Sequence, residues 1–262
     1  MTVTDVSALP PATGAWREGG EPGGRVWLGP GAPLVLESGE SLPGVRIAYE
    51  TWGRLAPDGS NAVLVLHALT GDSHVAGPAG PGHPTAGWWD AVVGPGRALD
   101  TRRWFVVAPN VLGGCQGSTG PSSPGPGGLP WGPAFPRLTQ RDQVTAEVRL
   151  ADALGIGRWA AVIGGSMGGM RALEWAACHP GRTGSLLLLA CRAALRAARM
   201  PALVAGVDSD RLYPLAQQRE LAAALPGADR ARVIGSPSGH DGFLLETDQV
   251  GALIRELLGE PG

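Results

Sequence analysis

One serine in this chain is flanked by glycines and stands between an apolar run and a helix-forming segment. It is Ser166, within Gly-Gly-Ser-Met-Gly at residues 164–168. Residues 159–163 are typical of a strand and residues 170–177 of a helix. Gly-x-Ser-x-Gly between a strand and a helix predicts a nucleophile elbow, whose serine hydroxyl stands clear of the sheet. A plain glycine-rich turn is the alternative in a chain with 42 glycines, and the flanking elements favour the nucleophile.

A serine hydroxyl becomes a strong nucleophile only when a base takes its proton and an acid orients that base. After an elbow of this kind, the acid and then the histidine follow the serine along the chain. Of the two histidines after Ser166, His179 ends the elbow's own helix, whereas His240 lies in a loop after the last predicted strand. His240 is therefore the predicted base. Asp208 and Asp210 both follow a predicted strand, and position alone does not decide which of them is the acid.

Acyl chemistry at a serine also needs two backbone N–H groups that stabilise an oxyanion. Met167, directly after the nucleophile, is expected to supply one of them. The loop His-Ala-Leu-Thr-Gly at residues 67–71 follows the first buried strand, and Leu69 is expected to supply the other. His67 and His74 offer a metal-binding alternative, but no paired carboxylate supports it, so no metal site is predicted.

Composition limits the classes of protein to consider. The chain has 262 residues, enough for one large α/β domain, and a net charge of −2 gives no electrostatic argument for nucleic acid or an anionic membrane. Three cysteines in no ligand spacing predict neither a disulfide framework nor a zinc site. No stretch has the pattern of a signal peptide or of a membrane span, so a cytoplasmic protein is expected.

Strands and helices are predicted to alternate along most of the chain, behind a flexible tail at residues 1–30 that is rich in proline and glycine. Short strands at 34–37 and 45–51 are expected to form a hairpin. The alternation from residue 62 onward predicts a mostly parallel sheet with helices on both faces, in one domain over residues 31–262. A glycine-rich loop at 110–136 is too long to be a plain connection, and such loops are usually functional or disordered. The remaining predicted strands are 62–66, 104–108, 186–190, 202–207 and 231–234, and the remaining predicted helices are 88–93, 139–154, 193–199, 215–225 and 246–258.

Several segments together resemble the homoserine O-acetyltransferase family, acyltransferases of methionine biosynthesis with the α/β-hydrolase fold. The resemblance covers about residues 34–190 and 201–258. The segments are Tyr-Glu-Thr-Trp-Gly at 49–53, His-Ala-Leu-Thr-Gly-Asp-Ser-His at 67–74, Gly-Trp-Trp-Asp at 87–90, Asn-Val-Leu-Gly-Gly-Cys-Gln-Gly-Ser-Thr-Gly-Pro at 110–121, Gly-Gly-Ser-Met-Gly-Gly at 164–169, Asp-Ser-Asp-Arg-Leu-Tyr-Pro at 208–214 and Gly-His-Asp at 239–241.

The resemblance implies a two-step transfer without a bound cofactor. Ser166 would take the acetyl group of the co-substrate acetyl-CoA, and the hydroxyl of L-homoserine would then take it from Ser166. The family pattern makes Asp210 the acid that orients His240. It also implies that Asp241 holds the ammonium group of the amino acid.

The chain departs from the family at one place. Members carry a long helical lid that narrows the substrate tunnel, supplies an arginine and a tyrosine to the substrate, and builds the dimer interface. That lid is expected between residues 191 and 200, where the sequence leaves room only for a short crossover. The resemblance therefore predicts a lid-less monomer. A serine esterase or thioesterase-like hydrolase and an inactive remnant of the family are the alternative functions.

Overall fold

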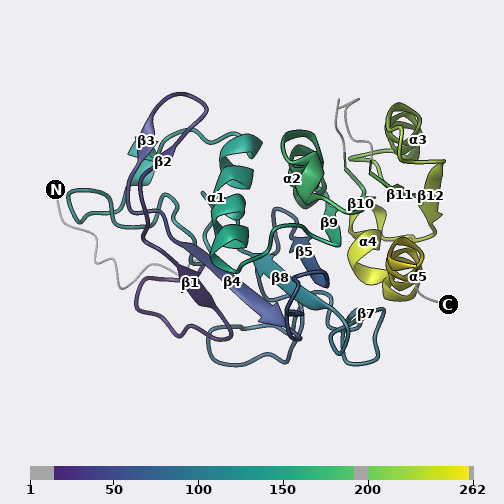
Figure 1. The fold of residues 1–262 in the computed structure, drawn as a ribbon, viewed down its shortest axis with the longest axis horizontal. Helices are drawn as coiled ribbons and strands as arrows, with labels where there is room; N and C mark the ends of the chain where they lie inside the picture. The colour runs from purple at the N-terminus through teal and green to yellow at the C-terminus, as the bar shows by residue number, and fades with distance from the viewer. Residues whose placement is uncertain (1–14, 192–199, 260–262) are drawn as a thin grey trace.

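An eight-stranded sheet forms the centre of the computed structural model, which describes residues 15–191 and 200–259 (Figure 1). The strand order is β1-β4-β8-β5-β9-β10-β11-β12. β1 and β4 run antiparallel to their neighbours, and the other six strands are parallel, which confirms the predicted mostly parallel sheet. The bounds are Val26–Leu28 (β1), Ile47–Trp52 (β4), Ala62–Leu66 (β5), Phe105–Pro109 (β8), Ala161–Gly165 (β9), Leu186–Leu189 (β10), Ala202–Val207 (β11) and Ala231–Ile234 (β12).

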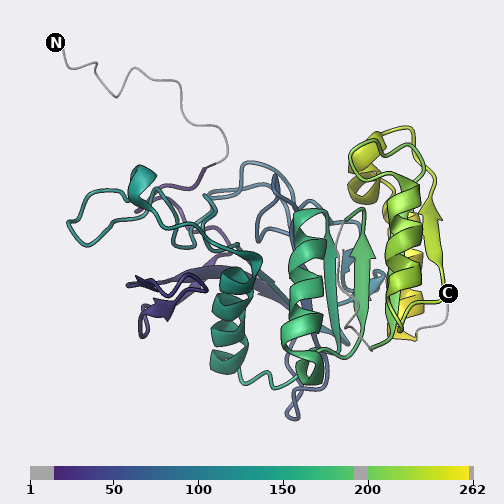
Figure 2. The same cartoon turned by 90° about the horizontal axis from the view of Figure 1, so that it is seen from above.

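Helices cover both faces of this sheet, as the alternating pattern predicts. The helices α1 (Gln140–Ala153), α2 (Met167–Cys178) and α3 (Leu215–Ala224) lie on one face, and Figure 2 shows them in front of the strands. The helices α4 (Gly242–Leu245) and α5 (Thr247–Leu258) lie on the other face. None of the helices in the described part of the chain has both the length and the apolar character needed to cross a membrane.

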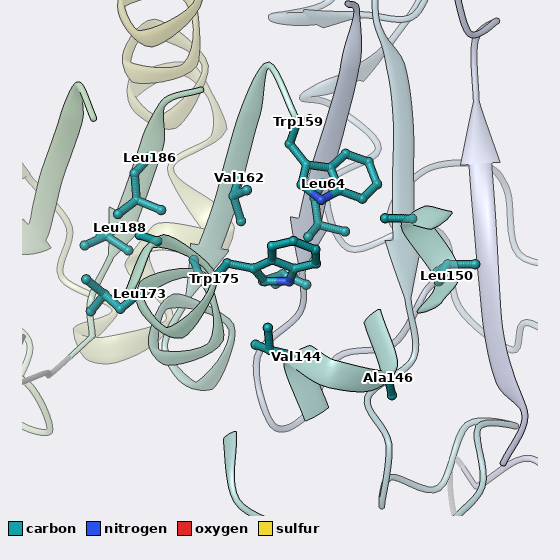
Figure 3. Packing of buried hydrophobic residues seen from close by; sticks show 14 of the residues in the cluster. Leu64, Val144, Ala146, Leu150, Trp159, Val162, Leu173, Trp175, Leu186 and Leu188 are labelled. Carbon is teal, nitrogen blue, oxygen red and sulfur yellow. The ribbon is translucent and has the colours of Figure 1, made fainter. Parts of the chain in front are cut away.

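The central strands are continuous apolar runs because each one contributes to two cores. Along β5, Leu64 packs toward α1 and α2, whereas the adjacent Val63 packs toward the opposite face. Side chains alternate between faces along a strand, so burial on both faces needs apolar residues at every position. Figure 3 shows the first of these cores, in which Trp175 of α2 lies close to Leu64 and Val162.

Two predictions for the N-terminal half of the chain are wrong: a strand pairing and a helix. The strand β2 (Leu34–Val35) pairs with β3 (Ser41–Leu42) in a separate two-stranded sheet and does not form a hairpin with β4. No helix forms at residues 88–93, where turns lead into β6 (Val93–Gly94), the parallel partner of β7 (Leu99–Asp100). The apolar run there ends at Gly-Pro-Gly, which leaves too few residues for a stable helix.

The predicted flexible tail does not hold for residues 15–30. β1 joins the central sheet beside β4, and the Arg25 side chain is buried, donating to the carbonyl of Gly82 and the side chain of Gln116. Residues 1–14 lie outside the described residues. So does the segment 192–199, which contains the predicted crossover helix 193–199 and the expected position of the missing lid.

Candidate active site

Ser166 forms the turn between β9 and α2. Its backbone has φ 52° and ψ −121°, a conformation that costs a residue with a side chain about 1–3 kcal/mol. The hydrogen bond from Ser166 N–H to the carbonyl of Leu189 helps to hold it. Glycine is required nearby because a Cβ at Gly168 would overlap the backbone carbonyl of Leu66 on the neighbouring strand. The close packing of strand, turn and helix explains the glycines of the motif.

Three of the predicted site residues meet through hydrogen bonds. The Ser166 hydroxyl donates to His240 Nε2, with Oγ and Nε2 2.9 Å apart. His240 Nδ1–H donates to Asp210 Oδ2 at 2.8 Å. This relay runs from a buried carboxylate through an imidazole to a hydroxyl, and it is the arrangement that lets a serine attack a carbonyl carbon.

Asp210 is held from its other side by the chain that follows it. Its Oδ1 accepts the N–H groups of Leu212 and Tyr213 at 2.8 and 2.9 Å, and the residue is 4% exposed. These bonds hold one carboxylate oxygen while the other accepts from His240 Nδ1. Asp210 therefore satisfies the geometric requirement for the orienting acid.

Asp208 has a different place in the same loop. Its Oδ1 accepts the N–H of Ser236 at 3.0 Å, which ties the end of β11 to the segment after β12. Ser209 strengthens the connection, since its hydroxyl accepts the N–H of Gly239 at 2.9 Å. Asp208 thus helps to hold the loop that carries His240, while Asp210 contacts the ring itself.

The two expected oxyanion donors lie on opposite sides of the nucleophile in the sequence and line one cavity. Met167 is the first residue of α2, and Leu69 lies in the loop after β5. Both line a cavity of about 520 Å³ that also contacts the segment 110–116. The glycine-rich loop 110–136 therefore contributes part of the wall of this cavity.

His67 anchors this oxyanion loop and has no free nitrogen for a metal. Its Nδ1 lies 2.7 Å from the carbonyl oxygen of Ala68, and its Nε2 accepts the N–H of Val111 at 3.1 Å. Burial, with a smaller effect from Arg171, lowers the pKa of His67 to about 3. The ring is therefore neutral, with the proton on Nδ1, and it joins the loop after β5 to the loop after β8.

A second connection between these loops passes through Ser73 and Asn110. The N–H of Ser73 donates to Asn110 Oδ1 at 2.7 Å, and Asn110 Nδ2 donates to Ser73 Oγ at 2.9 Å and to the carbonyl of Gln116 at 2.6 Å. Sequence reasoning assigned neither residue a role. Both fall within the family-like segments 67–74 and 110–121, which was the only available signal.

Among the described residues, one group brings three possible metal ligands together: Glu50, His74 and His83, all buried. The two imidazole rings stack with centroids 3.8 Å apart, a poor arrangement for two nitrogens that must converge on one ion. His83 Nε2 already accepts the N–H of Gly24 at 3.0 Å. The cluster is better explained as a buried hydrogen-bond network that fastens the N-terminal segment to β4.

Asp241, the expected contact for the substrate ammonium, is exposed and directly follows His240 in the turn Gly239–Asp241. The aromatic rings of Tyr213 and Phe243 flank His240 at centroid distances of 5.3 and 5.6 Å. Asp241 is therefore adjacent in the chain to the histidine that accepts the Ser166 hydroxyl proton in its hydrogen bond.

Comparison with known proteins places this geometry in a family. The family model for the alpha/beta hydrolase fold matches residues 61–191. A homoserine O-acetyltransferase of Thermobifida fusca is 46% identical over 370 positions, which cover 95% of this chain and 98% of the relative. One from Clavibacter michiganensis is 39% identical over 389 positions and covers all of both chains. These alignments exceed the 262 residues of this chain, so each relative has more than a hundred residues without a counterpart here.

Solved structures confirm the fold. The homoserine O-acetyltransferase from Bacillus anthracis superposes with a TM-score of 0.78 at 19% identity, covering 90% of this chain and 97% of that one. Esterase E22 superposes with a TM-score of 0.82 at 19% identity, covering 89% and 99%. The fold therefore occurs in both transferases and hydrolases, and it is the sequence identity with the curated relatives that decides between them. This chain belongs to the homoserine O-acetyltransferase family and has the α/β-hydrolase fold.

Proposed function

We propose that this protein transfers the acetyl group of acetyl-CoA to the hydroxyl of L-homoserine through an acyl-Ser166 intermediate, a step of methionine biosynthesis. The observation that carries the proposal is the hydrogen-bonded relay of Ser166, His240 and Asp210, in a chain whose gapped alignment spans 98% of a relative bearing that name. No bound cofactor is needed, since acetyl-CoA is consumed as a co-substrate. Because acetyl-CoA is the donor, we expect the protein to act in the cytoplasm.

In the first step, His240 Nε2 takes the hydroxyl proton as Ser166 Oγ attacks the thioester carbonyl carbon. The N–H groups of Leu69 and Met167 stabilise the negative charge on the carbonyl oxygen. Asp210 stabilises the imidazolium and keeps the Nδ1 proton in place. When the C–S bond breaks, His240 returns the proton to the departing thiolate.

In the second step, the homoserine hydroxyl is the attacking group and Ser166 Oγ is the leaving group. The hydroxyl of homoserine enters where the thiol left, gives its proton to His240 Nε2 and attacks the acyl carbon. Asp241, next to His240, supplies a carboxylate for the substrate ammonium. Collapse of the second intermediate returns the proton to Ser166 Oγ and releases the acetyl ester.

Hydrolysis is the second candidate function. Leu69 is 77% exposed, and more than a hundred residues of the relatives have no counterpart in this chain. An acyl-serine transfers to an alcohol only if the acceptor is held in place while water is kept away. An open site beside the oxyanion loop therefore favours water as the acceptor.

Release of CoA from acetyl-CoA, measured with and without homoserine, tests the proposal. Homoserine-dependent release supports the transferase, and equal release without homoserine supports the hydrolase. No release would mean that the relay is kept in an inactive protein. The Ser166→Ala variant serves as the control, because it retains the fold's other groups and removes only the attacking oxygen.

A further inference from the structure

The segment Gly-Trp-Trp-Asp at residues 87–90 has no part in the mechanism proposed above, although each of its residues makes a specific contact. The N–H groups of its first three residues donate to carbonyl oxygens of the segment 74–77, at 2.9, 3.2 and 2.9 Å. A Cβ at Gly87 would lie 2.4 Å from Ala76 Cα, so only glycine lets the two segments run this close. The carboxylate of the final aspartate accepts one more N–H from 74–77, at 2.8 Å. The segment 87–90 is therefore fixed to the chain that follows the oxyanion loop.

The indole of Trp89 connects this segment to the turn that carries His240. Its Nε1–H donates to the backbone carbonyl oxygen of Phe243 at 3.3 Å, and both residues are 1% exposed. The Phe243 ring lies edge-on to the His240 imidazole, with centroids 5.6 Å apart. A Cβ at Gly165 would lie 2.3 Å from the Phe243 ring, so the same ring packs on the residue before Ser166. Phe243 thus contacts both the nucleophile's strand and the base, and Trp89 holds its backbone.

The indole of Trp88 connects the same segment to the loop of the expected oxyanion donor Leu69. Its Nε1–H donates to the backbone carbonyl oxygen of Asp72 at 3.0 Å. Asp72 directly follows a turn closed by the hydrogen bond from Gly71 N–H to the Ala68 carbonyl, at 3.0 Å. Leu69 lies inside that turn. The two adjacent indole rings, with centroids 4.8 Å apart, therefore bind one backbone oxygen on the oxyanion side and one on the side of the base.

We propose that Trp88 and Trp89 are positioning residues, which together set the place of His240 relative to the oxyanion loop. The proposal rests on the acyl-serine chemistry proposed above and adds what holds its parts in place. Packing in a core requires only an apolar ring, whereas both N–H groups here bind backbone oxygens of the loops that form the site. Neither tryptophan lines the cavity of about 520 Å³, so they act through the loops and not on a ligand there.

His240 acts twice when Ser166 is acylated, and this separates the roles of the two tryptophans. It takes the Ser166 proton during the attack and passes it to the leaving group as the acyl bond breaks. A strongly basic leaving group needs that proton, whereas a weakly basic one leaves as an anion. Stabilisation of the oxyanion serves both kinds equally. Displacing His240 should therefore slow reactions with poor leaving groups most, and displacing the oxyanion donor should slow all reactions alike.

Phenyl acetate and p-nitrophenyl acetate are the probes, because they carry the same acetyl group on leaving groups of different basicity. In each case the Ser166 Oγ–acyl bond forms, the ester C–O bond breaks and a phenol leaves. The measurement is kcat/KM for release of each phenol, with release in the absence of protein subtracted. Trp89→Phe keeps a ring and removes the N–H, and it should lower kcat/KM for phenyl acetate about tenfold or more. The ratio of phenyl acetate to p-nitrophenyl acetate should fall about threefold or more.

Two further variants complete the test. Trp88→Phe should lower kcat/KM for both esters by the same factor and leave their ratio unchanged. Trp88 is half-buried, so this variant loses little packing and tests the link even if Trp89→Phe folds poorly. Trp159→Phe is the matched control: Trp159 is also 1% exposed, in the core on the other face of the sheet, but its Nε1 has no hydrogen-bond partner among the described residues. It should keep the wild-type rates and ratio.

Wild-type rates in the Trp88 and Trp89 variants would overturn the proposal. So would an unchanged ratio in Trp89→Phe, or an equal loss in Trp159→Phe. The two esters contain neither CoA nor homoserine, so a protein that fails to acetylate homoserine would contradict the proposed function and leave this proposal standing. A wild-type protein that releases phenol from neither ester would contradict the acyl-Ser166 chemistry and both proposals with it.

Discussion

Arg171, in the second turn of the helix that follows the nucleophile, donates from Nη2 to the backbone carbonyl oxygen of His67 at 3.1 Å. Its Nη1 pairs with Glu147 Oε1 at 2.5 Å, and Trp175 Nε1 donates to the other carboxylate oxygen at 2.7 Å. Arg171 and Glu147 are both buried. The hydrogen bond from Arg171 to the His67 carbonyl thereby joins the helix that begins at Met167 to the loop that carries Leu69, the two proposed oxyanion donors. The ion pair with Glu147 holds the Arg171 side chain in place.

Replacing Arg171 should therefore affect both stability and turnover. Arg171→Met leaves the buried Glu147 carboxylate unpaired and should lower the free energy of unfolding by about 3–5 kcal/mol. It also releases the His67 carbonyl, and misplacing an oxyanion donor should lower kcat by about 100-fold or more. Denaturant unfolding and steady-state kinetics measure the two effects.

The double variant Arg171→Met/Glu147→Gln separates them. It removes the unpaired charge while keeping an acceptor for Trp175, so stability should recover while kcat stays low. If turnover recovers together with stability, Arg171 has only a structural role.

Asp210→Asn is expected to lower turnover by about four orders of magnitude, because an amide no longer selects the required tautomer of His240. Asp208→Asn should cost far less, since an amide oxygen can still accept the Ser236 N–H that Asp208 Oδ1 accepts now. The measurement is kcat for CoA release by the two purified variants. A larger loss at Asp208 would reverse the assignment of the acid.

The pH dependence of the free energy of unfolding should reveal that the buried His67 resists protonation. Its pKa is lowered from 6.5 to about 3, chiefly by burial, so below pH 6.5 the unfolded chain binds a proton that the folded chain does not. The stability linked to this ring is fully present above pH 6.5 and is lost as the pH falls toward 3. One such group contributes a slope of about 1.4 kcal/mol per pH unit.

Urea unfolding of the wild type and of His67→Gln, compared between about pH 6 and pH 4, measures this slope. The wild type should lose stability more steeply than the variant, by roughly the contribution of one histidine. Other titrating groups contribute equally to both proteins and cancel in the comparison. Parallel curves would mean that His67 takes up a proton inside the folded protein.

The protein is expected to be a monomer. The family resemblance implies that the lid builds the dimer interface. The relatives have more than a hundred residues without a counterpart in this chain. Light scattering of the purified protein at micromolar concentration tests this. A stable dimer would require an interface built from the hydrolase domain itself.

Strands buried on both faces were predictable because every position must be apolar. The apolar run at Ala202–Val207, buried at every position, was predicted with the bounds that the structure has. Short edge strands such as β2 were assigned the wrong partner, because two or three residues contain no information about register. The start of helix α1 follows from the local sequence, since Thr139 and Asp142 form a capping box there.

The candidate site was also only partly predictable from the sequence. The elbow and His240 follow from local pattern and chain order, whereas the residues between Ser166 and His240 leave Asp208 and Asp210 equivalent. The family pattern selects Asp210, and the fold shows that its carboxylate contacts the His240 ring. Arg171 was missed because an arginine on a helix is usually solvated, and its partner Glu147 lies on a different helix.

The most direct test of the account is to follow the acyl group on Ser166. The protein is mixed with acetyl-CoA, quenched and digested, and the peptide that contains Ser166 is examined by mass spectrometry before and after addition of homoserine. The account predicts an acetyl group on Ser166 that disappears on addition of homoserine as O-acetylhomoserine forms, and no acetyl group in Ser166→Ala. An acetyl group on another residue, or O-acetylhomoserine formed by the Ser166→Ala protein, would contradict it.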